Sequence, residues 1–185
     1  MLGFIKGKTK YEWIKSSQYH CMVEMKASKL IISFQMSTID VVLIRHGESE
    51  WNKDNRFCGW VDVALSQKGI EEAYNAAKLL KESGYQKFDT VHTSQLKRST
   101  ETARIIVEEL TKQSDSAAEC SKELFQCVKH WRLNERHYGN LTGLNKIEMV
   151  NLHGLEKVME WRRSYDSPPP PITESNPYYH EIGNC

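Results

Sequence analysis

The stretch that decides the fold is IDVVLIRHGESEWN, which runs from Ile39 to Asn52. Its first half is a short run of apolar, mostly β-branched residues, which predicts a strand buried on both faces of a sheet. The run ends directly in Arg45, His46 and Gly47. In an open sheet of parallel strands, ligands bind outside the carboxyl ends of the strands. The sequence therefore indicates a functional site here, although these three residues would also suit an ordinary surface turn.

The chain beyond this strand alternates between helical and strand patterns. Ser66 can cap a helix whose apolar residues follow a period of about 3.6, and Gly84 comes just after its end. A strand is predicted near Phe88–His92, and Ser94 can cap the next helix. A further strand is predicted over Phe125–Trp131. This order of strands and helices predicts an α/β fold with parallel pairing and right-handed crossovers.

Length and composition narrow the class of protein. At 185 residues the chain is long enough for one domain with a single core. Its 25 basic and 24 acidic residues nearly balance, which gives no reason to expect a nucleic-acid or membrane partner. No apolar run reaches the ~18 residues of a membrane span or suits a signal peptide. The five cysteines form no Cys-x-x-Cys pair, which argues against a disulfide framework or zinc site and favours a cytoplasmic location.

Residues 1–35 differ in character from the rest of the chain. They carry six lysines against two glutamates and show no sustained helical or strand period. They are either a disordered basic leader or a non-native segment that precedes a natural start at Met36, and we favour the second interpretation. The expected organisation is thus a leader over 1–35 and one domain over 36–185.

The residues at the end of the first strand suit chemistry at phosphorus. A neutral imidazole can attack a phosphoryl group in line, and arginines can neutralise its oxygens without a metal ion. His46 would be the nucleophile and Arg45 the adjacent clamp. Gly47 would let the backbone come close to the phosphoryl group. The sequence therefore suggests phosphoryl transfer through His46.

Longer motifs extend this interpretation. The motifs are LIRHGESEWN at 43–52, NRFCGWVDVALSQKG at 55–69, TSQLKRSTETA at 93–103, WRLNERHYGNLTGLNK at 131–146 and WRRSYDSPPPP at 161–171. In this order they resemble segments of the 2,3-bisphosphoglycerate-dependent phosphoglycerate mutases, within the histidine phosphatase superfamily. The resemblance covers roughly Ile39–Ile182. It implies a three-layer sandwich with a mainly parallel central sheet flanked by helices.

The resemblance also implies a role for individual residues. His46 matches the histidine that becomes phosphorylated, and Arg45 lies beside it. Arg98 lies outside the inward apolar stripe of its predicted helix and matches the second phosphate-binding arginine. It falls in the first turn of that helix, where the free N–H groups of the helix start could also attract an anion. Glu135 matches the general acid and base. The substrate-binding positions of the mutases correspond to Asn52, Cys58, Gly59, Arg136, Tyr138, Lys146, Arg162 and Arg163.

Taken without the resemblance, these residues have ordinary alternatives. Glu135 beside Arg136 could form a surface ion pair, and Lys146 could be a solvated helix residue. The superfamily also contains phosphatases, in which water takes the phosphoryl group from histidine. Cys58 stands where mutases commonly have a small hydroxyl residue, and it leans toward the enzymes that make bisphosphoglycerate. Synthase or phosphatase activity is therefore the alternative, and a non-catalytic form that binds phosphorylated ligands or a partner subunit is a third hypothesis.

The activity that the resemblance implies is the interconversion of 2-phosphoglycerate and 3-phosphoglycerate. It would proceed through phosphohistidine, with 2,3-bisphosphoglycerate as the primer, no metal, and a homodimer as the full-length form. Mutases carry a second active-site histidine in a His-Gly-Asn stretch on a later strand, and this chain has no match for it. We therefore expect 36–185 to be a partial mutase-like domain, inactive or nearly so alone, with an exposed strand edge and incomplete apolar cover.

Overall fold

The computed structural model describes residues 2–6, 21–26, 29–34, 40–112 and 126–183. A four-stranded sheet has the order β4-β1-β5-β6. Strands β5 and β6 pair in parallel, whereas β1 is antiparallel to both β4 and β5, so that β4, β5 and β6 run in one direction. The α/β fold predicted from the sequence is thus confirmed. The strand bounds are Leu2–Lys6 for β1, Asp40–Ile44 for β4, Thr90–Thr93 for β5 and Gln126–Lys129 for β6.

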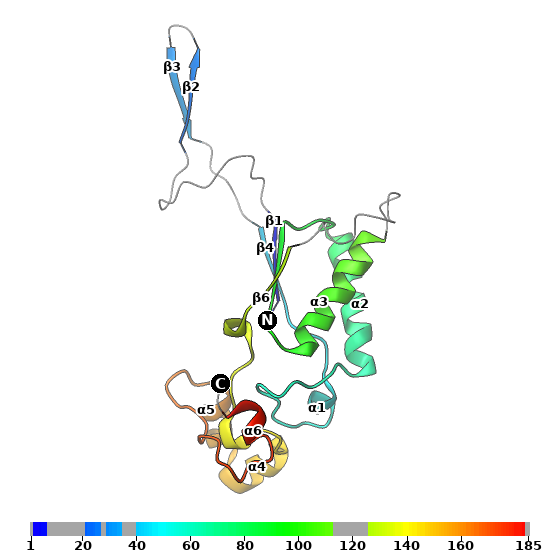
Figure 1. Cartoon of the computed structure of the whole chain (residues 1–185), viewed down its shortest axis with the longest axis vertical. Helices are drawn as coiled ribbons and strands as arrows, with labels where there is room; N and C mark the ends of the chain where they lie inside the picture. Colours follow the sequence, from blue (N-terminus) through cyan, green and yellow to red (C-terminus); the bar gives the residue numbers. More distant parts are fainter. Residues whose placement is uncertain (1, 7–20, 27–28, 35–39, 113–125, 184–185) are drawn as a thin grey trace.

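Two long helices lie side by side against one face of this sheet (Figure 1). They are α2, Gln67–Glu82, and α3, Lys97–Thr111. Val91 of β5 and Ile106 of α3 are fully buried at the centre of the core between them. Full burial of one such side chain stabilises the fold by about 1.5–3 kcal/mol. The predicted start of α2 is confirmed, because Ser66 Oγ accepts a hydrogen bond from the N–H of Gly69.

Helix α3 begins later than the sequence predicted. Its first residue is Lys97 and its N-cap is Leu96, which makes no side-chain capping bond. Ser94, the predicted cap, instead accepts a hydrogen bond through Oγ from the N–H of Leu96. Such a local bond between a serine side chain and the backbone competes with the helix and closes a turn ahead of it.

The opposite face of the sheet has no helical cover in the part of the chain that the structure describes. Val41 and Leu43 of β4 are 57% and 65% exposed, whereas Val42 and Ile44 pack on the core under the helices. Successive side chains of a strand point to opposite faces, and here only one face meets a helical layer. The prediction that this strand is buried on both faces is therefore wrong.

The leader contributes strands although its sequence shows no sustained period. β1 lies within the sheet, between β4 and β5. β2, Cys21–Lys26, and β3, Lys29–Phe34, form a separate antiparallel hairpin that projects away from the helices (Figure 1). Local pattern does not reveal β1 because its partners are distant in sequence, and strand preference depends strongly on such context. The other residues of the leader, 1, 7–20, 27–28 and 35, lie outside the described residues, so their disorder stays a prediction, as does the non-native origin of the leader.

A second group of short elements lies beyond the carboxyl ends of the parallel strands (Figure 1). Phe57, Val158 and Trp161 are central to its apolar core. No helix in the described ranges has the length and apolarity needed to cross a membrane. The helices of this group are α1, Glu50–Lys53, α4, Lys146–His153, α5, Leu155–Arg163, and α6, Tyr179–Ile182, with 3₁₀ turns at Trp131–Leu133 and Gly139–Leu141.

Candidate functional site

His46 lies in the loop that follows β4, and its proton is placed by one hydrogen bond. Its Nδ1 is 2.7 Å from the carbonyl oxygen of Gly47. Because a carbonyl oxygen only accepts, Nδ1 carries the proton of the neutral ring and Nε2 keeps its lone pair. Burial lowers the pKa of His46 to about 4, and the charges of Arg98 and Arg45 act in the same direction. At pH 7 the ring is thus neutral with a free nitrogen, as a nucleophile toward phosphorus requires.

The lowered pKa of His46 leads to a prediction about stability. Between pH 6.5 and about 4 the unfolded chain binds a proton at His46 that the folded chain does not, so the free energy of unfolding falls as the pH falls through this window. The full loss is on the order of 3 kcal/mol. Urea unfolding at several pH values should show a steeper fall for the native chain than for His46→Asn. Equal pH slopes for the two proteins would contradict the lowered pKa.

The loop that carries His46 is fixed to both long helices. The N–H of Gly47 donates to Thr102 Oγ1 of α3 at 3.1 Å, and this hydroxyl donates to the carbonyl oxygen of Arg98 at 2.7 Å. A Cβ on Gly47 would lie 2.2 Å from the carbonyl oxygen of Gly69 in α2. Gly47 is thus required for close contact with α2, which the sequence did not predict. Thr102 was also missed, and its position one helical turn after Arg98 was the signal that could have found it.

Arg98 is fully buried, although its helix pattern placed it outside the inward face. Its Nη1 donates to the carbonyl oxygen of Val61 at 3.0 Å, and its Nη2 donates to that of Gly59 at 2.6 Å. Nη2 also donates to Glu135 Oε2 at 2.9 Å. Such partners offset the cost of burying the charge and the Nη groups of a guanidinium, whereas the buried Nε of Arg98 has no hydrogen-bond partner among the described residues. Arg98 thus lies outside the apolar core clusters and is nevertheless buried, because its partners come from other segments, which a helical pattern does not include.

Glu135 connects this buried arginine to the surface of the site. Its side chain is 30% exposed and forms an ion pair with Arg98. Its backbone carbonyl accepts a hydrogen bond from Trp60 Nε1 at 2.7 Å, which fixes the segment in place. The ion pair therefore joins α3 to the segment of Glu135. It differs from the surface ion pair between Glu135 and Arg136 that the sequence offered as an alternative. A carboxylate held on one side and open on the other is suited to a general acid and base.

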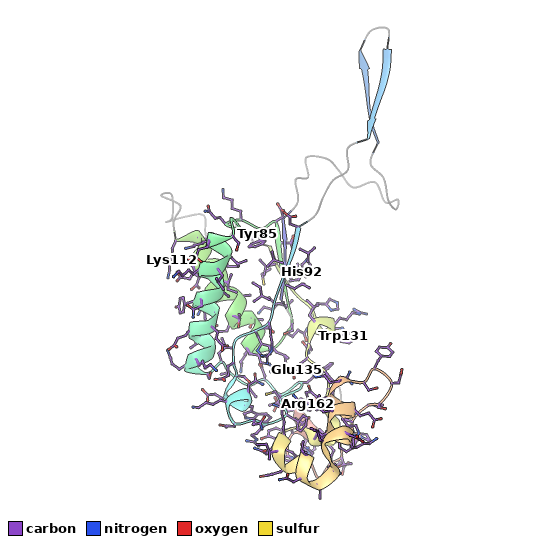
Figure 2. The ribbon with its side chains drawn as sticks, turned by 180° about the vertical axis from the view of Figure 1, so that it is seen from behind. Tyr85, His92, Lys112, Trp131, Glu135 and Arg162 are labelled. Atoms are coloured by element: carbon purple, nitrogen blue, oxygen red, sulfur yellow. The ribbon has the colours of Figure 1, made fainter. Side chains whose placement is uncertain are left out.

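A cavity of about 450 Å³ opens beside Glu135. Four of its seven lining side chains are cationic and one is anionic, which suits a ligand with several negative charges. Burial lowers the pKa of Lys146, and burial together with the charge of Glu135 raises the pKa of Tyr138 to about 12. Figure 2 shows Glu135 and Arg162 near one another at this end of the molecule. The lining residues are Arg45, Asn52, Glu135, Tyr138, Lys146, Arg162 and Arg163.

Three of the predicted binding residues lie outside this lining, as do two of the predicted catalytic residues, His46 and Arg98. Cys58 is buried, with Sγ at 3.5 Å from Ser49 Oγ and 3.8 Å from Asn52 Nδ2. Burial raises the pKa of the Cys58 thiol, which is therefore neutral at pH 7. The carbonyl oxygen of Gly59 accepts a hydrogen bond from Arg98 Nη2. Arg136 is partly buried and is also absent from the cavity wall.

The start of α3 is already occupied by an acidic side chain. The N–H of Lys97 donates to Asp62 Oδ1 at 2.6 Å, so the aspartate stands where an anion would meet the helix. The expectation that free N–H groups of this helix add to the anion field is thus not met at Lys97. Within the described ranges, no group of three or more His, Cys, Asp or Glu side chains is placed to hold a metal ion.

A family model and several solved structures match this chain. The family model described as the histidine phosphatase superfamily (branch 1) matches residues 41–179. Among solved structures, a protein described as mycobacterial hydrolase 1 is 24% identical with a TM-score of 0.52, over 67% of this chain and 51% of that one. A mycobacterial glucosyl-3-phosphoglycerate phosphatase in complex with VO3 is 25% identical with a TM-score of 0.52, over the same shares of the two chains.

The chain thus spans about half the length of the solved structures that it matches. The family match, in contrast, extends over most of the chain and includes the loop of His46, the start of α3 and the segment of Glu135. These are the parts that the hydrogen bonds of Arg98 and Gly47 bring together. The chain belongs to the histidine phosphatase superfamily, branch 1.

Proposed function

We propose that this protein transfers phosphoryl groups through a phosphohistidine at His46. The observation that supports this most strongly is the bond from Nδ1 to the Gly47 carbonyl, in a neutral ring whose Nε2 is free. Nε2 would form a bond to phosphorus while the bond from phosphorus to the leaving oxygen breaks. The charges of Arg45 and Arg98, which already act on His46, would neutralise the phosphoryl oxygens. Glu135 would protonate the leaving oxygen.

Within this class the proposed activity is that of a phosphoglycerate mutase. The substrates would be 2-phosphoglycerate and 3-phosphoglycerate, with 2,3-bisphosphoglycerate as the primer and no metal. The support is the positive charge of the cavity. Lys146, Arg162 and Arg163 line it together with Arg45, and four cationic side chains are more than one phosphate requires. Bisphosphoglycerate brings two phosphates and a carboxylate to such a pocket. Glu135 would take the proton of the accepting hydroxyl as the phosphoryl group returns from histidine. A cytoplasmic location and a homodimer belong to the same proposal.

A phosphatase is the second candidate, favoured by the likeness to the glucosyl-3-phosphoglycerate phosphatase. In that reaction water, activated by Glu135, would take the phosphoryl group from His46. Cys58 stands where mutases commonly have a small hydroxyl residue, and its buried neutral thiol is a weaker hydrogen-bond donor; it leans toward a third candidate, the synthesis of bisphosphoglycerate. The mutase and the phosphatase share the first step and differ in the acceptor.

Single-turnover labelling tests the shared step. Little turnover is expected of this chain alone, because it has no match for the second active-site histidine, so the test follows one round of transfer. The purified chain is mixed with radiolabelled 2,3-bisphosphoglycerate, and we expect a slowly formed, acid-labile label that peptide mapping assigns to His46. Addition of 3-phosphoglycerate then separates the candidates, because a mutase passes the label to the sugar acid whereas a phosphatase releases it as inorganic phosphate. A chain that is folded by circular dichroism and takes up no acid-labile label would contradict the proposal.

A further inference from the structure

β1 is the link between β4 and the rest of the sheet in the part of the chain that the structure describes. β4 pairs with β1 along its whole length, from Ile44 opposite Leu2 to Asp40 opposite Lys6. The other edge of β1 pairs with β5. Strands in a sheet are about 4.8 Å apart, so β4 and β5 are separated by twice that spacing, which is too far for direct backbone hydrogen bonds.

The register places one residue of the leader between the two strand ends that lead to the site. Leu2 pairs with Ile44, which directly precedes Arg45 and His46. Leu2 also pairs with Thr93, which ends β5 shortly before α3 and Arg98. A slip of β4 against β1 by one residue would offset these ends by about 3.4 Å. Such an offset would break the 3.1 Å bond from the Gly47 N–H to Thr102.

We propose that Leu2–Lys6 is a positioning element of the site, which bridges β4 and β5 and thereby fixes His46 relative to Arg98. The bridge consists of backbone pairing on both edges of β1. It assigns a role to the first part of the leader that the composition of the leader does not suggest. This proposal depends on the proposed function in one respect, which is that His46 is taken as the centre of the site.

Two proline variants of the full chain test this role. Phe4→Pro removes a backbone N–H at the middle of β1, where both neighbouring strands pair. Glu24→Pro is the matched control, because it interrupts β2, which pairs with β3 in the separate hairpin. The readouts are the pKa of His46 from an NMR titration and the hydrogen exchange of backbone amides, neither of which depends on turnover.

In Phe4→Pro we expect the pKa of His46 to rise from about 4 toward 6.5, because the loop loses its buried position. Amides of Val41–Ile44 should exchange roughly 10- to 100-fold faster, while α2 and α3 stay protected. Glu24→Pro should leave both readouts unchanged. If Phe4→Pro does not fold, Phe4→Gly keeps the N–H and weakens the strand, and the same changes are expected at smaller amplitude.

Two results would overturn the role of β1. One is an unchanged pKa of His46 in a folded Phe4→Pro protein. The other is rapid exchange of the amides of Gly3–Ile5 in the native chain, since paired strands at the centre of a sheet exchange slowly. Labelling of His46 is scored separately. A native chain with protected β1 amides and no acid-labile label would contradict the proposed function and leave the role of β1 intact.

Discussion

His46→Asn is expected to take up no acid-labile phosphate from 2,3-bisphosphoglycerate under conditions that label the native chain. The asparagine Nδ2 can still donate to the Gly47 carbonyl, as Nδ1 of His46 does at 2.7 Å. It has no nitrogen with a lone pair where Nε2 lies, so the attacking atom is missing. Loss of a covalent nucleophile lowers the rate by a factor on the order of 10⁴ or more. The measurement is the rate of label uptake in a single turnover, analysed at neutral pH.

The matched control is His153→Asn, which makes the same substitution on an exposed residue at the end of α4. We expect its rate of label uptake to equal that of the native chain. Folding is checked at pH 7, where His46 is neutral, so that replacing it removes no charge. If His46→Asn acquired acid-labile label at the native rate, the phosphoryl group would reside on another residue and the assignment of His46 would be wrong.

The sequence predicted well those features that depend on local pattern. Helix α2 follows from Ser66 as its cap and from apolar residues at helical spacing. The place of His46 after a strand follows from the abrupt end of an apolar run. In each case the residues that determine the feature lie within about one element of each other, so a short window contains the necessary information.

Features that depend on contacts between distant segments were not predictable in this way. β1 acquires its structure from pairing with two strands far along the chain, and its own sequence shows no period. The exposure of Val41 and Leu43 depends on which face of the sheet receives helices, and the strand pattern alone does not contain that information. A strand assignment from local sequence is therefore more secure than a statement about how many of its faces are buried.

The candidate site shows the same division. Motifs placed Arg45, Lys146, Arg162 and Arg163 in the site, and these residues do line one cavity. The motifs did not show that Gly47 is needed for contact with α2 or that Asp62 occupies the start of α3. Both features arise where two loops meet a helix. The charge of the pocket was therefore readable from sequence, whereas the contacts that hold it in shape were not.

Arg98→Ala is expected to lower the free energy of unfolding by about 3–5 kcal/mol. The substitution removes the hydrogen-bond donors of two buried carbonyl oxygens, those of Gly59 and Val61, and leaves Glu135 without its cation. An uncompensated buried polar group is destabilising even where the original pair contributed little. Urea unfolding at pH 7, followed by circular dichroism, measures the change. Arg104→Ala on the exposed face of α3 is the matched control, with an expected loss of about 0–1 kcal/mol.

A double-mutant cycle with Glu135→Gln separates the two causes of this loss. If the unpaired carboxylate accounts for much of it, Arg98→Ala should be less destabilising in the Glu135→Gln background, with a coupling energy of about 0.5–3 kcal/mol. If the carbonyl oxygens of Gly59 and Val61 account for it, the two substitutions should be additive. An Arg98→Ala protein as stable as Arg104→Ala would show that the guanidinium is not the buried centre of these contacts. It would also remove the physical link between the segment of Glu135 and the loop of His46, because Arg98 joins the segment of Glu135 to the helix that holds this loop.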